Sequence, residues 1–542
     1  MDKVISQAAY FSIAALSVLW LVSLIQLYKP HPARFLQFLK THSLDIIFSF
    51  ALAAIIFITV KPDLRVLNDE TNLLNVARSM YYERDVRVIE EANWEGPKLK
   101  HLTYKHASRP LLFPFFVHLF HLLLGYSVGH IFLANFMALG VVFYLLCRFL
   151  RPLIGPVAAF SAVLLVAAQP IVSLTATSGH YDVFNLCFFL IALLSLDRFL
   201  REPSRRNFVF MWLSLLMQAH IRNESFLFLI VIVLGLCLFR LMKWKYLATF
   251  VFPVSVLVQL PLGYVQWRTN PFLRLNAFMP ENGDAFSLEN FFHNHQIFLK
   301  SLFHFDAYLP YASVVNLLGI LGIGLFWIRQ IRRKAFLSNQ VLTVETFALS
   351  TYLVGFWILI SSLVKAEMNH APSARFYLVF CVTWSVFAVY MGMALSVLRR
   401  LPALIFLISL AFFFIYHPVA IRHQIFKDYD VGRYSGVHHL VMDFLNGLRD
   451  DRFLLATPQC PRYVAYNLAA IRPWRLEKEK QRLIDMLNRK DLAHIYMIET
   501  VNKKMNTSRL PEQWGFSWKP VYIRHHGPDS NLLISEVKLP EV

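Results

Sequence analysis

The chain has 542 residues, of which 57% are hydrophobic and 16% charged, whereas about 25% of the residues in a soluble globular protein are charged. This composition excludes a soluble protein. The formal net charge of +19 could suit nucleic acid, but Lys and Arg gather in short loops between long apolar runs. That distribution is the positive-inside pattern of a multi-pass membrane protein with anionic lipid, and not nucleic acid, as its neighbour.

The first apolar run, Ala8 to Tyr28, is long enough to span a bilayer, and no clean cleavage site follows it, so we expect a retained helix. A short basic loop with Lys29 and Lys40 should face the cytoplasm. A second span, Leu44 to Val60, then carries the chain to the outer side.

The first large outer loop, residues 61–127, opens with two adjacent carboxylates, Asp69 and Glu70. An amphipathic helix follows, with apolar side chains from Leu73 to Met80 on one face. A carboxylate at a membrane surface can take a proton from a hydroxyl at the lipid edge. The alternative interpretation is an Asp acting as helix N-cap with Glu in the first turn. The centre of the loop, Tyr82 to Lys105, shows no clear period.

The apolar stretch from Arg109 to Gly125 is short for a span and is broken early by prolines. If it lies on the outer surface, the next span is Val128 to Leu150, and every later arginine cluster falls on the cytoplasmic side. If it spans, all of those clusters move outside. The positive-inside rule therefore favours a helix on the membrane surface.

With this alternation of cytoplasmic and outer loops, the chain has about twelve predicted spans in all. The later ones are Val157–Val172, Val183–Leu196, Phe208–Ala219, Phe226–Phe239, Tyr246–Leu262, Tyr311–Ile328, Phe347–Val364, Phe376–Ala394 and Leu401–Tyr416. The outer loops then hold the polar segments Thr175–Asp182, His220–Glu224, Gly263–Pro310 and Lys365–Arg375.

The chain turns polar near residue 421, so we divide it into a membrane domain, 1–420, and a small extracytoplasmic α/β domain, 421–542. Two strands are expected at Arg452–Thr457 and Leu492–Ile498, with an amphipathic helix at Arg475–Arg489 between them. A hairpin is expected from Val521–Arg524 and Leu532–Val537.

Four segments in this order resemble the GT-C membrane glycosyltransferases, and within them the protein O-mannosyltransferase and lipid A aminoarabinose transferase group. Asp69-Glu70 and its helix look like the Asp-Glu motif of that family. Arg109-Pro110 with the apolar stretch to Gly125 resembles a segment that leads a juxtamembrane helix. Ser178–Asp182 resembles the second acidic loop, and Ala374–Tyr377 resembles an Arg-Tyr segment before a late span. The resemblance covers roughly residues 44–401.

The resemblance implies a sugar donor on a polyprenyl phosphate and inversion at the anomeric carbon. Asp69 would be the general base, with Glu70 and Asp182 as further acidic residues of the site. Arg375 would hold the donor phosphate, since a guanidinium binds phosphate bidentately, and Arg109 and Arg222 are further candidates. Where the aminoarabinose enzymes have a Glu before their Lys-Pro-Pro, this chain has Ser108, so that contact is in doubt. The acceptor would be a hydroxyl of a lipid, glycan or protein, and the location a bacterial inner membrane.

Simpler interpretations remain open for several of these residues. Asp182 could cap its helix, Arg222 and Glu224 could form an interfacial ion pair, and Arg375 could anchor a helix at the interface. A transporter or flippase of lipid-linked saccharide, or an inactive relative that binds such lipids, is the alternative function. A transporter should show internal repeats or ionisable residues at mid-span, and neither is seen.

A metal or other cofactor is not indicated by the sequence, although a divalent metal stays possible. The five cysteines show no CxxC or other paired spacing, so disulfides and cysteine metal sites are not expected. His293 and His295 form an HxH pattern, but no acidic cluster stands at metal-binding spacing.

Overall fold

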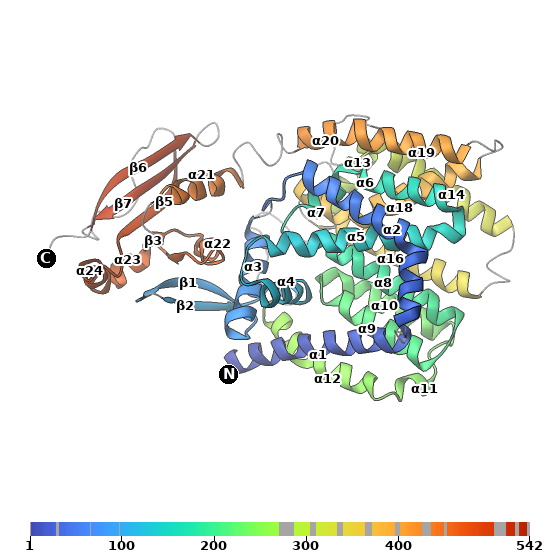
Figure 1. The fold of residues 1–542 in the computed structure, drawn as a ribbon, viewed down its shortest axis with the longest axis horizontal. Helices are drawn as coiled ribbons and strands as arrows, with labels where there is room; N and C mark the ends of the chain where they lie inside the picture. Colours follow the sequence, from blue (N-terminus) through green and yellow to red (C-terminus); the bar gives the residue numbers. More distant parts are fainter. Residues whose placement is uncertain are drawn as a thin grey trace.

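The computed structural model describes residues 2–28, 32–65, 67–96, 98–269, 287–303, 311–332, 340–363, 371–395, 401–424, 435–448, 452–502, 516–525 and 530–538. Much of the predicted loop Gly263–Pro310, and most of Lys365–Arg375, lie outside these ranges. The molecule is elongated, with a large helical part and a smaller part built around a β-sheet, and both chain termini lie near the sheet (Figure 1). We call the end of the helical part next to the sheet the site end.

The helical part contains, within the described ranges, eight helical stretches long and apolar enough to cross a membrane. Each overlaps one of the predicted spans. They are α1 (Asp2–Tyr28), α2 (Pro32–Thr59), α5 (His130–Ile154), α8 (Asp182–Arg201), α14 (Ser313–Arg332), α16 (Gln340–Ser361), α18 (Leu378–Ala394), which follows the short η2 (Arg375–Tyr377), and α19 (Leu401–Ala411), which continues through η3 (Phe412–Tyr416) into α20 (His417–Gln424).

The predicted span Val157–Val172 is a pair of helices, α6 (Pro156–Ala167) and α7 (Pro170–Ala176), bent by 70°. The bend follows from Pro170, because proline cannot donate to the preceding turn and keeps Gln169 extended. The side chain of Gln169 satisfies backbone and side-chain groups at the break, accepting from the Ala312 N–H at 2.8 Å and donating to Asn316 at 3.0 Å. The bend directs the chain after α7 toward the site end.

The three remaining predicted spans form helices that do not match the length and apolarity of the other eight. They are α9 (Arg205–Ala219), α10 (Phe226–Leu238), which follows the short η1 (Asn223–Ser225), and α12 (Val251–Thr269). The short helices α11 (Trp244–Leu247), α13 (Leu288–Leu302) and α17 (Ala371–Ala374) complete the helical part.

The helix α4 (Leu112–Leu124) lies at the site end beside α3 (Leu67–Glu83) (Figure 1). Its 13 residues extend only about 20 Å, too short to cross a bilayer. Leu122, Leu123 and Leu124 are exposed at its end, as suits a helix on the membrane surface. The length of α4 agrees with the prediction that Arg109–Gly125 does not span.

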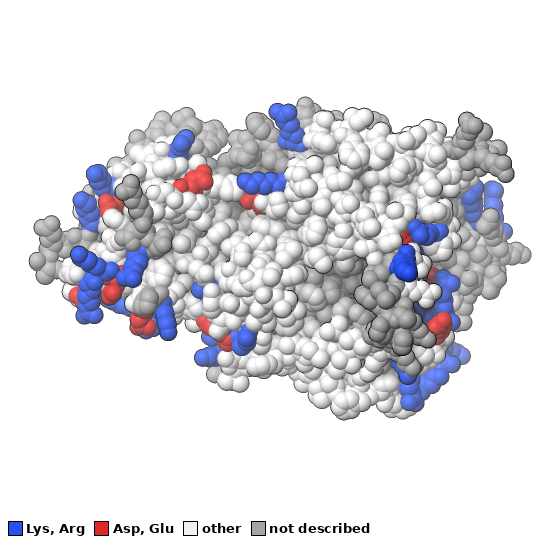
Figure 2. Space-filling view, in the orientation of Figure 1, with Lys and Arg blue, Asp and Glu red and all other residues white. Residues whose placement is uncertain are grey.

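Basic residues at the ends of α5, α8 and α14 lie at the opposite end of the helical part from the site end. α8 begins at the site end with Asp182 and reaches Arg198 and Arg201 about 30 Å further along. α5 ends with Arg151, and α14 ends with Arg329 and Arg332. Charged side chains stand at the two ends of the molecule, with a largely uncharged helical belt between them (Figure 2). The uncharged belt has the character of a surface that faces lipid.

Within the described ranges the sheet has seven strands, in the order β2-β1-β4-β3-β5-β7-β6. β3 (Phe453–Ala456) pairs in parallel with β4 (Ala469–Ile471) and β5 (His494–Asn502), and β7 (Ser530–Lys538) pairs antiparallel with β5 and β6 (Ser517–His525). The helices α21 (Ser435–Asn446) and α22 (Cys460–Val464) cover one apolar face, and α23 (Trp474–Lys478) with α24 (Lys480–Asn488) cover the other. The α/β character of this region was predicted, while the short buried β4 was not.

The other two strands of this sheet come from the first loop. β1 (Arg87–Glu95) and β2 (Lys98–His106) form a hairpin, and Ala92 of β1 pairs with Ala470 of β4. One sheet therefore combines segments that the predicted division at residue 420 places apart. The sequence analysis did not predict this hairpin, because charged residues on both faces of its strands interrupt the alternation of apolar and polar residues that is typical of a strand.

Candidate functional site

The helix α3 places Asp69 where two arginines from distant parts of the chain meet. Arg109, just before α4, donates from Nη2 to Asp69 Oδ1 at 2.6 Å. Arg375, at the start of η2, donates from Nη2 to Asp69 Oδ2 at 2.9 Å. The helix begins at Leu67, so Asp69 lies inside the first turn and is not the N-cap of the helix. The interpretation of Asp69 as N-cap is therefore wrong.

The loop between α7 and α8 contributes His180 and Asp182. His180 Nδ1 lies 2.7 Å from Asp182 Oδ2, and Arg222 donates from Nη1 to Asp182 Oδ1 at 2.8 Å. Asp182 is the first residue of α8, and both its oxygens are bound to side chains. His180 also faces α3, with Nε2 3.7 Å from Asp69 Oδ2. A chain of carboxylate, imidazole and carboxylate thus links Asp69 to Asp182.

Glu70 points away from the arginines and supports this loop. It is fully buried, and its Oε1 accepts from the Gly179 N–H at 2.8 Å. Asn135 of α5 donates to the carbonyl oxygens of Ser178 and His180 at 2.8 and 2.7 Å. The adjacent carboxylates predicted as a pair therefore have different roles, since Asp69 faces the arginines and Glu70 holds the backbone that positions His180.

Arg222 forms the predicted ion pair with Glu224 and also contacts Asp182. Its Nε donates to Glu224 Oε2 at 3.0 Å, so the predicted ion pair forms, and its Nη1 reaches Asp182. Its guanidinium also lies 4.6 Å from the ring centre of Phe376, against which Arg375 lies at 5.4 Å. One aromatic ring therefore holds two cations near each other, which offsets part of their repulsion.

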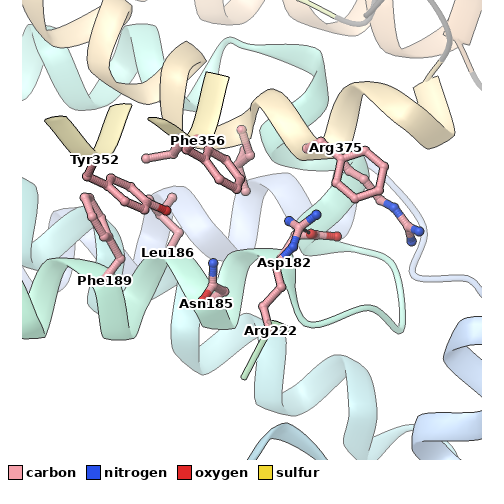
Figure 3. A pocket seen from close by; sticks show the side chains of 11 residues that line it. Asp182, Asn185, Leu186, Phe189, Arg222, Tyr352, Phe356 and Arg375 are labelled. Atoms are coloured by element: carbon pink, nitrogen blue, oxygen red, sulfur yellow. Dashed lines mark hydrogen bonds and ion pairs between the residues drawn. The ribbon is translucent and has the colours of Figure 1, made fainter. Parts of the chain in front are cut away.

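A pocket opens beside these residues between α8, η1, α16 and α18 (Figure 3). Asp182, Arg222 and Arg375 form its charged end, while Phe189, Tyr352 and Phe356 gather at the other end (Figure 3). Its remaining lining residues are Asn185, Leu186, Phe376, Leu378 and Val379. The pocket thus suits a molecule with an anionic group at one end and an apolar body.

The side chain of Arg375 is not saturated within the part of the chain that the structure describes. Its Nη2 binds Asp69, but Nε and Nη1 are buried and have no hydrogen-bond partner there. Buried N–H groups are almost always paired, so two unpaired donors on one guanidinium at a pocket indicate a missing acceptor. A phosphate oxygen is an acceptor that suits such a charged donor.

Electrostatics keep Asp69 ionised. Burial by itself would raise the pKa of this carboxyl group, but its interactions with His180, Arg109 and Arg375 outweigh burial and hold the pKa well below the usual value of 3.8. At neutral pH Asp69 is therefore a carboxylate.

The described residues contain no group of three or more His, Cys, Asp or Glu side chains that could hold a metal ion. All six predicted site residues, Asp69, Glu70, Asp182, Arg109, Arg222 and Arg375, lie in one region, connected by the contacts above. The sequence analysis did not select His180, although the spacing His-x-Asp at the start of a span could have indicated it.

Comparison with known proteins gives one family match. Residues 108–264 match the family model for dolichyl-phosphate-mannose-protein mannosyltransferase. No curated protein sequence matches the chain significantly.

Comparison with solved structures identifies the fold. The structure of ArnT from Cupriavidus metallidurans in the apo state is 13% identical, with 91% of this chain and 98% of that chain covered and a TM-score of 0.51. ArnT bound to undecaprenyl phosphate is 14% identical over the same shares, with a TM-score of 0.47. The Archaeoglobus fulgidus oligosaccharyltransferase in the apo form is 9% identical, covering 84% and 69%, with a TM-score of 0.47.

The first of these matches shows that the chain has the multi-pass membrane fold of ArnT, and with the family model it confirms the predicted GT-C resemblance. The family match and the fold together support a glycosyltransferase.

Proposed function

We propose that this chain is an inverting glycosyltransferase that moves a hexosyl or pentosyl group from a polyprenyl phosphate to a hydroxyl of a lipid, glycan or protein. The observation that carries the proposal is the position of Arg375, which binds Asp69 and also lines the charged end of a pocket whose other end is aromatic. A polyprenyl-phosphate sugar has an anionic group between an apolar chain and a polar sugar, and this arrangement matches its three parts.

The donor phosphate lies at the charged end of the pocket, where Arg375 and Arg222 meet it. The two unpaired N–H groups of Arg375 bind its oxygens. As the bond between the sugar and the phosphate breaks, negative charge grows on the phosphate, and fixed guanidinium groups stabilise that charge. The leaving group needs no proton, because a phosphate carries its charge well at neutral pH.

Asp69 is the general base of the reaction. Its carboxylate takes the proton of the acceptor hydroxyl while that oxygen attacks the anomeric carbon from the side opposite the phosphate. Attack from the opposite side inverts the anomeric centre. Arg375 contacts Asp69 and also lines the charged end of the pocket, so the base stands next to the donor phosphate.

The site and the sheet lie on the extracytoplasmic face of a bacterial inner membrane in this proposal. The support comes from the basic ends of α5, α8 and α14, which lie away from the site end and suit the cytoplasmic side. No metal or other cofactor enters the proposed reaction, because the arginines supply the positive charge that a metal ion would otherwise bring to the phosphate.

The test is transfer by the purified protein in lipid nanodiscs with a radiolabelled polyprenyl-phosphate sugar, measured at limiting donor. Arg375→Ala should lose tens- to hundreds-fold in rate, since a bidentate charge-assisted contact contributes on the order of 2–4 kcal/mol. Arg201→Ala is the matched control, because Arg201 pairs with Asp197 at the opposite end of α8. Unchanged kinetics in Arg375→Ala would remove this residue from the donor site. Movement of the labelled lipid across the bilayer without transfer would favour a flippase instead.

A further inference from the structure

One polar side chain of the pocket has no task in the reaction proposed above. Asn185 of α8 lies between the charged end and the aromatic end of the pocket and is partly exposed there (Figure 3). Its Oδ1 accepts from Ser225 Oγ at 2.8 Å and from Gln218 Nε2 at 3.5 Å. Within the part of the chain that the structure describes, its Nδ2 has no hydrogen-bond partner. Both N–H groups of this amide are therefore available to a ligand.

The two contacts of Oδ1 fix the orientation of the amide group. Ser225 of η1 and Gln218 of α9 are both buried, and they hold the same oxygen atom. The other branch of the amide, which carries the nitrogen, is thus directed away from them. In Figure 3 the nitrogen of Asn185 points upward, toward the space that Tyr352 and Phe356 border from above. The amide therefore presents its donors to the pocket.

Helix α8 presents three different kinds of side chain to the pocket along one face. Asp182, Asn185 and Phe189 follow one another at spacings of three and four residues, so they lie about 5 Å and then about 6 Å apart along the axis. Their order is a carboxylate that is paired with an arginine, a neutral amide and an aromatic ring. A lipid phosphate has a matching order, with charged oxygens, an ester oxygen and a hydrocarbon chain.

We propose that Asn185 binds the phosphate group of the lipid donor, by hydrogen bonds from Nδ2 to phosphate oxygens on the side of the lipid chain. This inference rests on the function proposed above, in which the sugar lies on the other side of the phosphate, toward Asp69. A lipid that enters the pocket displaces water from Nδ2, and an amide N–H left without an acceptor costs free energy. The hydrocarbon chain has no acceptor atom, so the phosphate oxygens receive these hydrogen bonds.

A neutral donor suits the balance of charge around the pocket. Three arginines are paired there with three carboxylates: Arg109 and Arg375 with Asp69, and Arg222 with Asp182 and Glu224. Nη2 of Arg222 has no hydrogen-bond partner among the described residues, as is the case for Nε and Nη1 of Arg375. With Nδ2 of Asn185, four nitrogen atoms can donate, and the two free oxygens of a phosphate diester can each accept two hydrogen bonds. The amide adds a contact to the phosphate without adding a charge.

The test is equilibrium binding of two lipids to the purified full chain in nanodiscs: a polyprenyl phosphate, and the polyprenol of the same length that lacks the phosphate. Asn185→Asp keeps an acceptor oxygen for Ser225 and Gln218 but replaces the N–H donors with a negative charge. The Kd for polyprenyl phosphate should rise about ten- to hundredfold, the scale of one hydrogen bond to a charged group, and the Kd for polyprenol should stay within threefold. A purely structural role of Asn185 predicts no change, because the contacts of Oδ1 persist.

The matched control is Asn207→Asp, because Asn207 lies on α9 away from the site end and its Oδ1 accepts from Arg198 Nε at 3.2 Å. It should leave both Kd values as in wild type. In Asn185→Asp, an unchanged Kd for polyprenyl phosphate would overturn the inference, and so would an equal rise for both lipids. Absence of polyprenyl phosphate binding by wild type would overturn the proposed function itself. If Asn185→Asp does not fold, Asn185→Leu decides in the same way, with an expected rise of about tenfold for polyprenyl phosphate alone.

Discussion

Asp69→Asn is the substitution that tests the proposed chemistry most directly. Asn has nearly the same shape as Asp but cannot accept the acceptor's proton, so kcat should fall about a hundredfold or more. Binding of the lipid should not fall with it. Because Asp69 competes with phosphate for Arg109 and Arg375, the variant should bind polyprenyl phosphate as tightly as wild type or more tightly.

The cost in stability follows from the contacts of the carboxylate. Asp69 accepts charge-assisted hydrogen bonds from two arginines, and its side chain is 18% exposed. Asn retains one acceptor oxygen and no charge, so the free energy of unfolding should fall by about 1–3 kcal/mol. This loss shifts a thermal transition by a few degrees and leaves the fold intact.

The pH dependence of this difference has a definite sign. A carboxyl group whose pKa is lowered in the folded state stabilises the protein above its unfolded pKa, about 4, and loses that contribution as the pH falls through the lower folded pKa. The difference in stability between wild type and Asp69→Asn should therefore be constant from about pH 5 to 8 and shrink only below about pH 4.

The assay combines transfer, lipid binding and thermal unfolding on the same nanodisc samples. Asp63→Asn is the matched control, since Asp63 lies in the same segment and pairs with His439 at 3.0 Å away from the arginines. An active Asp69→Asn variant would refute the assignment of the base. If Glu70→Gln is inactive while Asp69→Asn keeps most of its activity, the base is Glu70, and if both variants stay active, the transferase interpretation of this helix fails.

Three further predictions concern the framework of the site. Gly179→Ala should reduce turnover, because the added Cβ would stand 2.7 Å from Leu64 Cδ2 and push the loop that carries His180; measured kcat should fall while expression persists. Asn75→Ala should loosen the sheet from α3, since Asn75 is fully buried and bonds the backbone of Ile89 and Pro461, and limited proteolysis should cut the C-terminal region faster than in wild type. A reporter that works only in the cytoplasm, fused after Val542, should be silent, and activity of this reporter would contradict the proposed sidedness.

The sequence alone determined the membrane class, the fold family and the grouping of the polar loops. These properties depend on long apolar runs, on the placement of basic residues, and on the order of short motifs. All of these can be recognised in short stretches of the sequence. The same patterns placed Arg109–Gly125 on the surface, because moving it into the membrane would have reversed the side of every later arginine.

Other features depended on contacts between residues far apart in the chain. The contact of Asp69 with Arg375 was not predicted, because the two residues are 306 positions apart and no local pattern indicates such a pairing. The hairpin in the first loop was missed because its strands complete a sheet whose other strands begin beyond residue 450.

The separate roles of Asp69 and Glu70 also came only from the tertiary structure. In the sequence they are equivalent adjacent carboxylates, but successive residues of a helix point about 100° apart. That rotation turns Asp69 toward two arginines and Glu70 toward the backbone of Gly179. The sequence therefore determined that acidic and basic groups would gather at one end of the membrane domain. Only the packing of α3 against the loop before α8 decided that Asp69 faces the arginines and that Glu70 supports the loop with His180.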